Sequence, residues 1–311
     1  MLGKKDGQLS FGQVEASRRV SQGHFLKRIE EKVDWKPMEE LLEGLYPSRR
    51  GRPSYPPLTI LKALLLQQWY GLSDPGLEEA IGDRISFQQF LGLSFRDPVP
   101  DETTICKFRS LLARKGLSEK LFGLVGEQLD AKGLIVRRGS LIDASLLQAQ
   151  RKPGGDPDAK TTSRKGKPYH GYKAHATVDQ KSEILRHLEL TSANVHDSTM
   201  FVTMMRGDEQ SVFADKAYSK DGRKSVLREY GIFCGILDKA RINQPLSGKQ
   251  RKRNKRLSRV RSAVERVFGT FKRHYGMNRV RYVGLMRNRA HLFLVGICYN
   301  LKKLLTLEAA R

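Results

Sequence analysis

The hydrophobic pattern changes its period near Gly133, and this change limits the folds open to the 311-residue chain. Before Gly133, apolar residues recur at the spacing of helices. The clearest such segments are 59–70, 101–112 and 117–134. After it, short apolar runs predict strands at 139–147, 172–178, 184–190, 212–214 and 232–237, then helices at 257–274 and 292–305. The chain is therefore expected to have a mostly α-helical region over 1–135, followed by an α/β region over 136–311.

The charge is distributed as unevenly as the hydrophobic pattern. The chain has 57 Lys and Arg against 33 Asp and Glu, a net charge of +24. Residues 1–135 hold 20 basic and 18 acidic residues, whereas residues 136–311 hold 37 and 15, a net of +22. This excess predicts a polyanionic partner, with nucleic acid favoured well ahead of an anionic membrane surface.

Membrane insertion and secretion are not expected. No run of about 18 uncharged apolar residues is present, and the polar N-terminus lacks the apolar core of a signal peptide. The three cysteines, Cys106, Cys234 and Cys298, are odd in number and far apart, which fits a reducing compartment. We therefore expect a cytoplasmic protein.

Three acids stand in unusual settings. Asp143 interrupts an apolar strand, where a carboxylate is costly unless it meets a cation. Asp215 follows a buried strand, at the position where α/β sheets place functional groups. Glu265 is the only acid between Asp238 and Glu308, a segment of 69 residues that holds 19 Lys and Arg. A lone carboxylate in such surroundings either forms salt bridges or binds a metal ion.

The helix around Glu265 leaves both interpretations open. Arg261, Glu265 and Lys272 fall within about 40° of one another on one stripe, beside the apolar stripe. The three side chains can hold a divalent ion beside a phosphate, or Arg261 and Glu265 can form an ordinary surface pair. Three carboxylates would favour Mg²⁺ or Mn²⁺ over zinc. Two such ions can drive in-line displacement at phosphorus.

Several segments together carry a resemblance to a known family. They lie at 51–74, 100–109 (PDETTICKFR), 139–145 (GSLIDAS), 171–179, 193–198 (ANVHDS), 214–220 (ADKAYSK) and 261–276. In these segments, and in their order along nearly the whole chain, the sequence resembles bacterial DDE transposases of the insertion sequence five family. The resemblance implies an RNase H-like mixed sheet flanked by helices over 136–311. It also implies a helical DNA-binding and dimerisation domain over 1–135.

The resemblance also assigns roles to residues. It implies that Asp143, Asp215 and Glu265 are the catalytic acids and bind Mg²⁺, for which Mn²⁺ would substitute. Arg261 and Lys272 match the family's Arg-x₃-Glu-x₆-Lys signature and would position phosphate. The related signature often begins with a Tyr three residues before the Arg, where this chain has Ser258.

Further basic residues are candidates for contacts with DNA. Lys173 and Lys216 could reach phosphates near the acids. Within the basic run 249–256 the candidates are Lys252, Arg253, Lys255 and Arg256. They would grip the DNA backbone irrespective of sequence, unless the run is simply a solvated loop. His196 and Asp197 either shape a turn or lie next to the metal.

The expected function is that of a Mg²⁺-dependent transposase. It would bind the terminal inverted repeats of its element, cleave phosphodiester bonds there and join the 3′-hydroxyls to target DNA. Since both ends must be cut in one complex, we expect a homodimer or larger assembly on DNA, at the bacterial nucleoid. Two alternatives remain: a domesticated, catalytically silent DNA-binding regulator, and a metal-dependent nuclease without strand transfer. The presence of all three acids favours an active enzyme over the first.

Overall fold

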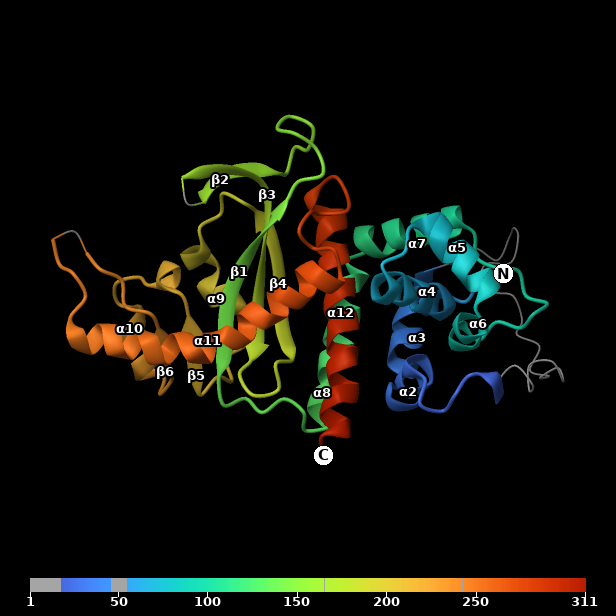
Figure 1. Cartoon of the computed structure of the whole chain (residues 1–311), viewed down its shortest axis with the longest axis horizontal. Helices are drawn as coiled ribbons and strands as arrows, with labels where there is room; N and C mark the ends of the chain where they lie inside the picture. Colours follow the sequence, from blue (N-terminus) through green and yellow to red (C-terminus); the bar gives the residue numbers. More distant parts are fainter. Residues whose placement is uncertain (1–17, 46–54, 165, 242) are drawn as a thin grey trace.

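The structure is a computed structural model that describes residues 18–45, 55–164, 166–241 and 243–311. Its first part is helical, as predicted (Figure 1). The helices are α2 (Phe25–Lys32), α3 (Lys36–Leu42), α4 (Pro57–Tyr70), α5 (Asp74–Asp83), α6 (Ile85–Leu91), α7 (Glu102–Arg114) and α8 (Leu117–Ala131). The polar N-terminus and residues 51–54 of the matching segment 51–74 lie outside the described residues.

Short-range chemistry sets the ends of these helices. Gly71 ends α4 in the left-handed conformation, at φ 65°. Ser73 caps α5 by accepting a hydrogen bond from the Gly76 N–H, and Asp101 caps α7 by accepting one from the Thr104 N–H at 2.6 Å. Each of the two side-chain caps gives a partner to a backbone N–H that has none within its helix.

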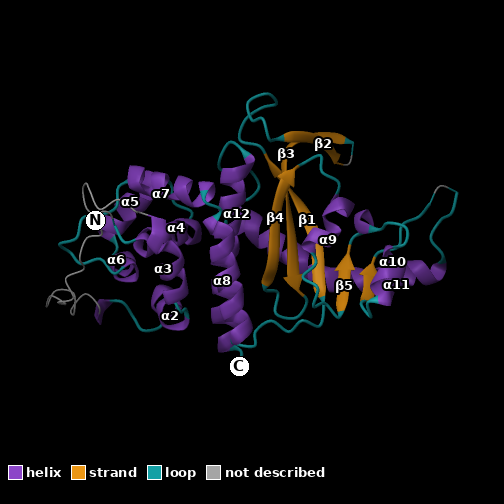
Figure 2. Ribbon diagram, turned by 180° about the vertical axis from the view of Figure 1, so that it is seen from behind, coloured by secondary structure: helices purple, strands orange, loops and turns teal. Residues whose placement is uncertain are grey.

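The second part is built on a mixed sheet (Figure 2). Its strands are β1 (Ser140–Gln148), β2 (Lys160–Arg164), β3 (Lys167–Asp179), β4 (Leu185–Ser192), β5 (Ser211–Ala214) and β6 (Phe233–Ile236). The order β4-β3-β1-β5-β6 is antiparallel from β4 to β1 and parallel from β1 to β6. The short strand β2 pairs with the beginning of β3. This order and these directions give an RNase H-like sheet, which confirms the predicted fold class.

Helices cover both faces of the sheet. On one face, α9 (Phe201–Met204) and α10 (Arg223–Glu229) pack over a small apolar cluster that includes Ile142. On the other face lie α11 (Gly248–His274) and α12 (Leu285–Ala309).

Helix α12 joins the two parts of the molecule. It packs against β4 on one side and against α4, α7 and α8 on the other (Figures 1 and 2). The predicted boundary at residue 135 falls in the loop between α8 and β1, but one apolar core continues across it through α12. This helix is long and apolar enough to cross a membrane, yet 78% of its most apolar window is buried inside the protein. We therefore interpret it as a core helix.

Two segments differ from the prediction. Helix α11 begins at Gly248 instead of residue 257, because Ser247 and Gln250 form a capping box that starts it. The basic run 249–256 is thus helical, where a solvated loop was the alternative. No strand is predicted from the sequence between residues 147 and 172, but this segment contains β2 and the beginning of β3.

Candidate active site

Asp143 lies where β1 extends past the end of its neighbour β5. The parallel pairing of the two strands joins Ser140–Ile142 to Val212–Ala214 and stops one residue before Asp143. The carboxylate of Asp143 accepts a hydrogen bond from the Ala144 N–H at 2.9 Å. On this side, residues 143–147 of β1 have no strand partner within the described part of the chain.

Asp215 is the first residue after β5. Its carboxylate accepts a hydrogen bond from the Lys216 N–H at 2.7 Å and caps the short turn that follows. Because β1 and β5 are adjacent and parallel, their carboxyl ends bring Asp143 and Asp215 to the same edge of the sheet.

Arg261 of α11 joins these two aspartates. One guanidinium nitrogen lies 3.2 Å from Asp143 Oδ2 and the other lies 3.5 Å from Asp215 Oδ1. The arginine is 7% exposed, since α11 packs against β1 and β5. A residue predicted to position phosphate therefore already contacts two of the predicted catalytic acids.

The carboxyl group of Asp143 has a strongly perturbed pKa. Burial raises its pKa to about 6, although Arg261 and the Ala144 N–H act in the opposite direction. Asp215 and Asp197 add to the rise, because a second negative charge disfavours ionisation. A perturbed carboxyl at the open end of a sheet is a common mark of a functional site.

Glu265 lies on α11 one turn after Arg261 and is exposed. Across the described ranges, no three His, Cys, Asp or Glu side chains are gathered in a way that could hold a metal ion. Asp143 and Asp215 nevertheless supply the carboxylate oxygens that Mg²⁺ and Mn²⁺ prefer. The aspartate pair therefore fits a divalent ion by donor type, and Glu265 is the third predicted acid on the adjoining helix.

Comparison with known families decides what kind of protein carries this site. A family model described as Transposase DDE domain matches residues 135–301, more than half of the chain. The chain belongs to this transposase family. A second model, described as Transposase domain (DUF772), matches residues 14–111. The two together are characteristic of bacterial insertion-sequence transposases. Membership implies an enzyme that cleaves DNA and transfers its strands, and the family generally uses divalent metal ions.

Similar solved structures are transposases as well. The cryo-EM structure of a piggyBac transposase synaptic complex with hairpin DNA is 11% identical with a TM-score of 0.42, over 95% of this chain and 79% of that chain. The Mos1 strand transfer complex is 11% identical with a TM-score of 0.20, over 94% and 91%. A pre-cleavage Mos1 transpososome is 9% identical with a TM-score of 0.21, over 96% and 98%. The fold of the present transposase is assigned from its own strand order.

The other signature residues of the transposase lie along α11. Lys272 is half-buried near the end of the helix, where its carbonyl accepts a hydrogen bond from Asn278 at 3.2 Å. Ser258, at the position of the signature Tyr, is exposed. Lys216, next to Asp215, is exposed as well. Their roles in binding phosphate stay predictions.

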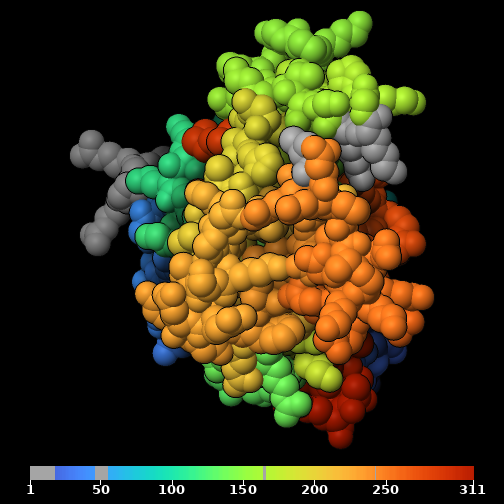
Figure 3. Space-filling model, turned by 90° about the vertical axis from the view of Figure 1, so that its left-hand side faces the viewer, coloured from blue at the N-terminus to red at the C-terminus, as the bar shows by residue number. Residues whose placement is uncertain are grey.

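The basic residues at the beginning of α11 divide into two kinds. Lys252, Lys255 and Arg256 are exposed, on the segment coloured orange in Figure 3. Arg253 is half-buried and donates to the carbonyls of Cys234 at 2.6 Å and Ile236 at 2.9 Å. It also contacts Asp238 at 2.9 Å. Arg253 thus ties α11 to β6, a structural role that the sequence did not indicate.

Two residues besides the predicted acids, Asp197 and Tyr218, lie near Asp143. Asp197 was predicted either to shape a turn or to lie near the metal, and it is close enough to Asp143 to raise the pKa of that carboxyl. It forms an ion pair with Lys173 at 2.7 Å. Tyr218 is fully buried, and its hydroxyl has no hydrogen-bond partner among the described residues. The only sequence signal for Tyr218 was its place in the matching segment 214–220.

Proposed function

We propose that this transposase binds the terminal inverted repeats of its insertion element, cleaves phosphodiester bonds there and joins the 3′-hydroxyls to target DNA. One observation carries the proposal. Asp143 and Asp215 lie at the ends of adjacent parallel strands and share the buried Arg261. They do so beside a helix in which Glu265 is the only acid among many basic residues.

The acids and Arg261 would have different roles at the site. Asp143 and Asp215 would hold Mg²⁺, or Mn²⁺ in its place, and Glu265 would complete the site from the exposed side of α11. When bound, two such ions activate the attacking oxygen and stabilise the leaving one. Arg261 keeps the two aspartates side by side, and its guanidinium can donate to phosphate oxygens next to them.

The rest of the protein would bind and pair the DNA. Lys272, Lys216 and the exposed Lys252, Lys255 and Arg256 would contact phosphates, while the helical region would recognise the element end. Because two ends must be cut together, the active form would be a homodimer or larger on double-stranded DNA. It would act at the nucleoid in the cytoplasm.

The test uses a duplex copied from the element terminus that flanks the coding sequence. Asp143→Asn, Asp215→Asn and Glu265→Gln should each reduce Mg²⁺-dependent cleavage at least about 10³-fold, since charge stabilisation carries most of this chemistry. End binding in a gel shift should change little. The control is Asp221→Asn, because Asp221 is an exposed acid, six positions from Asp215, whose ion pair among the described residues is with Arg241. Cleavage at the wild-type rate by any of the three variants would remove that residue from the site.

The same assay separates the two alternatives. Cleaved ends without joined products would indicate a nuclease. Selective end binding with neither product, in Mg²⁺ or in Mn²⁺, would indicate a silent regulator.

A further inference from the structure

Asp215 lies just beyond the sheet, so the strand pairing does not fix its position. The paired residues of β5 end at Ala214, against β1 as well as against β6. Asp215 instead begins a short helical turn, η3 (Lys216–Tyr218), in which the Tyr218 N–H donates to the Asp215 carbonyl at 3.0 Å. Since a single turn has few hydrogen bonds of its own, the orientation of the Asp215 carboxylate depends on what holds η3 in place.

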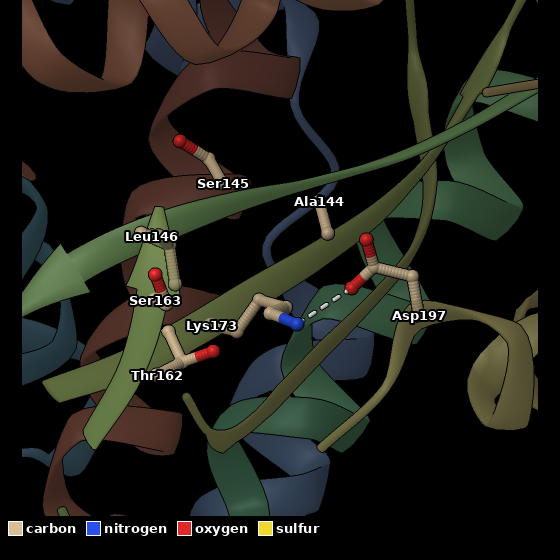
Figure 4. A pocket seen from close by; sticks show the side chains of 7 residues that line it. All are labelled: Ala144, Ser145, Leu146, Thr162, Ser163, Lys173 and Asp197. Atoms are coloured by element: carbon tan, nitrogen blue, oxygen red, sulfur yellow. Dashed lines mark ion pairs between the residues drawn. The ribbon is translucent and has the colours of Figure 1, made fainter. Parts of the chain in front are cut away.

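A second short turn, η2 (Asp197–Met200), packs against η3. It begins with Asp197, which lines a polar cavity of about 240 Å³ together with Lys173 and residues 144–146 of β1 (Figure 4). These residues of β1 directly follow Asp143. The two turns therefore meet beside the strand that carries the first acid of the site, and Asp197 is near enough to act on the pKa of Asp143.

Arg223, the first residue of α10, connects the two turns. Its guanidinium donates to the carbonyl of Tyr218, the last residue of η3, and to the carbonyl of Ser198 in η2 at 3.0 Å. It also lies over the ring of Phe201, with 4.3 Å between the guanidinium carbon and the ring centroid. The rings of Phe201 and Tyr218 pack against each other, at 6.3 Å between centroids. One side chain therefore holds both turns in a fixed arrangement.

The contacts of Arg223 indicate a geometric role and not the neutralisation of an acid. Its hydrogen bonds go to two backbone carbonyls, and no carboxylate pairs with it among the described residues. Burial lowers the pKa of Arg223, whereas a partner acid would raise it. A guanidinium presents its N–H groups in a rigid, planar fork, which suits two carbonyls at once, whereas a lysine ammonium is a compact point charge.

We propose that Arg223 is a positioning residue for the acid site: by joining η2 to η3, it fixes the orientation in which Asp215 meets a divalent ion. This inference rests on the proposed function, because it assumes that Asp143 and Asp215 bind the ion. Loss of a group that orients a metal-binding side chain typically lowers metal affinity about 10- to 100-fold. The effect of Arg223 should therefore be visible in metal binding alone, without DNA or cleavage.

The experiment measures the affinity of the full-length protein for Mn²⁺ by electron paramagnetic resonance, which reports the free ion. Arg223→Lys should weaken Mn²⁺ binding about tenfold, because an ammonium does not replace the fork that joins the two carbonyls. Arg223→Gln should weaken it at least as much. The direction of this second effect separates position from charge, since removing a positive charge near two carboxylates would by itself strengthen the binding of a cation.

Arg228→Gln is the matched control, because Arg228 is an exposed arginine on the same helix. This variant should not weaken Mn²⁺ binding. Phe201→Leu removes the aromatic ring beneath the guanidinium of Arg223 and should weaken Mn²⁺ binding about two- to threefold. The melting temperature of each metal-free variant verifies that it is folded.

Wild-type affinity for Mn²⁺ in the folded Arg223 variants, or in Phe201→Leu if those variants do not fold, would overturn the inference. So would tighter binding by Arg223→Gln. Asp215→Asn tests the proposed function separately: if this variant loses Mn²⁺ binding while the Arg223 variants keep it, only the inference fails. A wild-type protein that binds no Mn²⁺, or an Asp215→Asn variant that binds it normally, would contradict both.

Discussion

The helical region and the sheet region each contain a partly buried aspartate paired with a buried arginine, and the two pairs behave in opposite ways. In the helical region, Asp74 accepts hydrogen bonds from Arg109 and Gln67, each at 2.5 Å. Burial acts to raise its pKa, but these bonds and the charge of Arg281 outweigh burial and lower it. At the sheet edge, Asp143 shares Arg261 with a second aspartate, and its pKa rises to about 6.

The opposite pKa shifts distinguish an acid with a structural role from an acid that is a candidate for catalysis. Asp74 accepts hydrogen bonds from Arg109 and Gln67 that lower its pKa, and the pairing therefore stabilises the folded protein. Asp143 accepts hydrogen bonds from the Ala144 N–H and from Arg261, but its deeper burial and the nearby Asp215 and Asp197 raise its pKa. This costs stability and marks Asp143 as a candidate ligand-binding group.

Removing the charge of Asp74 should destabilise the protein strongly. Asp74→Asn should lower the free energy of unfolding by about 2–3 kcal/mol, because Arg109 stays buried without its carboxylate. Urea denaturation followed by circular dichroism measures this loss. Asp221→Asn, at an exposed pair, should change stability by less than about 0.5 kcal/mol. Equal losses in the two variants would mean that burial of the pair is irrelevant.

Two arginines of α11, the half-buried Arg253 and the exposed Arg256, allow a similar comparison between a structural charge and a surface charge. Arg253→Ala should cost about 1.5 kcal/mol of stability, because it removes the bonds to the Cys234 and Ile236 carbonyls. Arg256→Ala should leave stability unchanged and weaken DNA binding. The slope of the logarithm of the binding constant against the logarithm of the salt concentration should fall in magnitude by about 0.9. Denaturation and salt-dependent gel shifts measure the two effects. If Arg256→Ala destabilised the protein as much as Arg253→Ala, Arg256 would be a structural residue despite its exposure.

Asp143→Asn should stabilise the metal-free protein at pH 8 by about 1 kcal/mol. An acid whose folded pKa is raised disfavours folding wherever it is ionised, so the cost is fully present above pH 6. The cost disappears as the pH falls from about 6 to the unfolded value of about 4. Thermal unfolding of the wild type and the variant from pH 4 to 8 should therefore show a difference in melting temperature that narrows toward pH 4. If this difference widened toward pH 4, the pKa of Asp143 would be lowered in the folded protein and not raised.

Lys216 should give the smallest effect. Lys216→Ala should slow cleavage about two- to threefold without altering the melting temperature, because the side chain is exposed and its attraction to phosphate is screened. Raising the salt concentration should remove the difference. A melting temperature several degrees lower would indicate that Lys216 is a structural residue.

Much of the architecture could be predicted from local sequence. Gly71 and Asp101 mark helix ends through their own backbone and side-chain chemistry, and the apolar runs around Asp143 and Asp215 predict strands directly. The beginning of α11 could not be found in this way, because 249–256 is too basic to show an apolar stripe. Only the capping box of Ser247 and Gln250 signals it.

The residues of the candidate site could be proposed from the sequence, but their contacts could not. The positions of Asp143, Asp215 and Arg261 follow from the matching segments, whereas the sharing of Arg261 between the two aspartates depends on how α11 crosses the sheet. Likewise, the pairing of Lys173 with Asp197 requires two strands and a turn to fold first. Such long-range contacts leave no periodic signal in the sequence.

The place of α12 has a consequence for how the protein folds. Helices α4 and α8 emerge early in synthesis, yet the surface that covers them belongs to the last helix of the described chain. Until that helix is made, their apolar faces have no native cover, and contacts so distant in sequence form slowly. The nascent chain therefore carries an exposed hydrophobic surface for most of its synthesis. A product truncated before α12 should be a target for chaperones and proteases rather than a partly active enzyme.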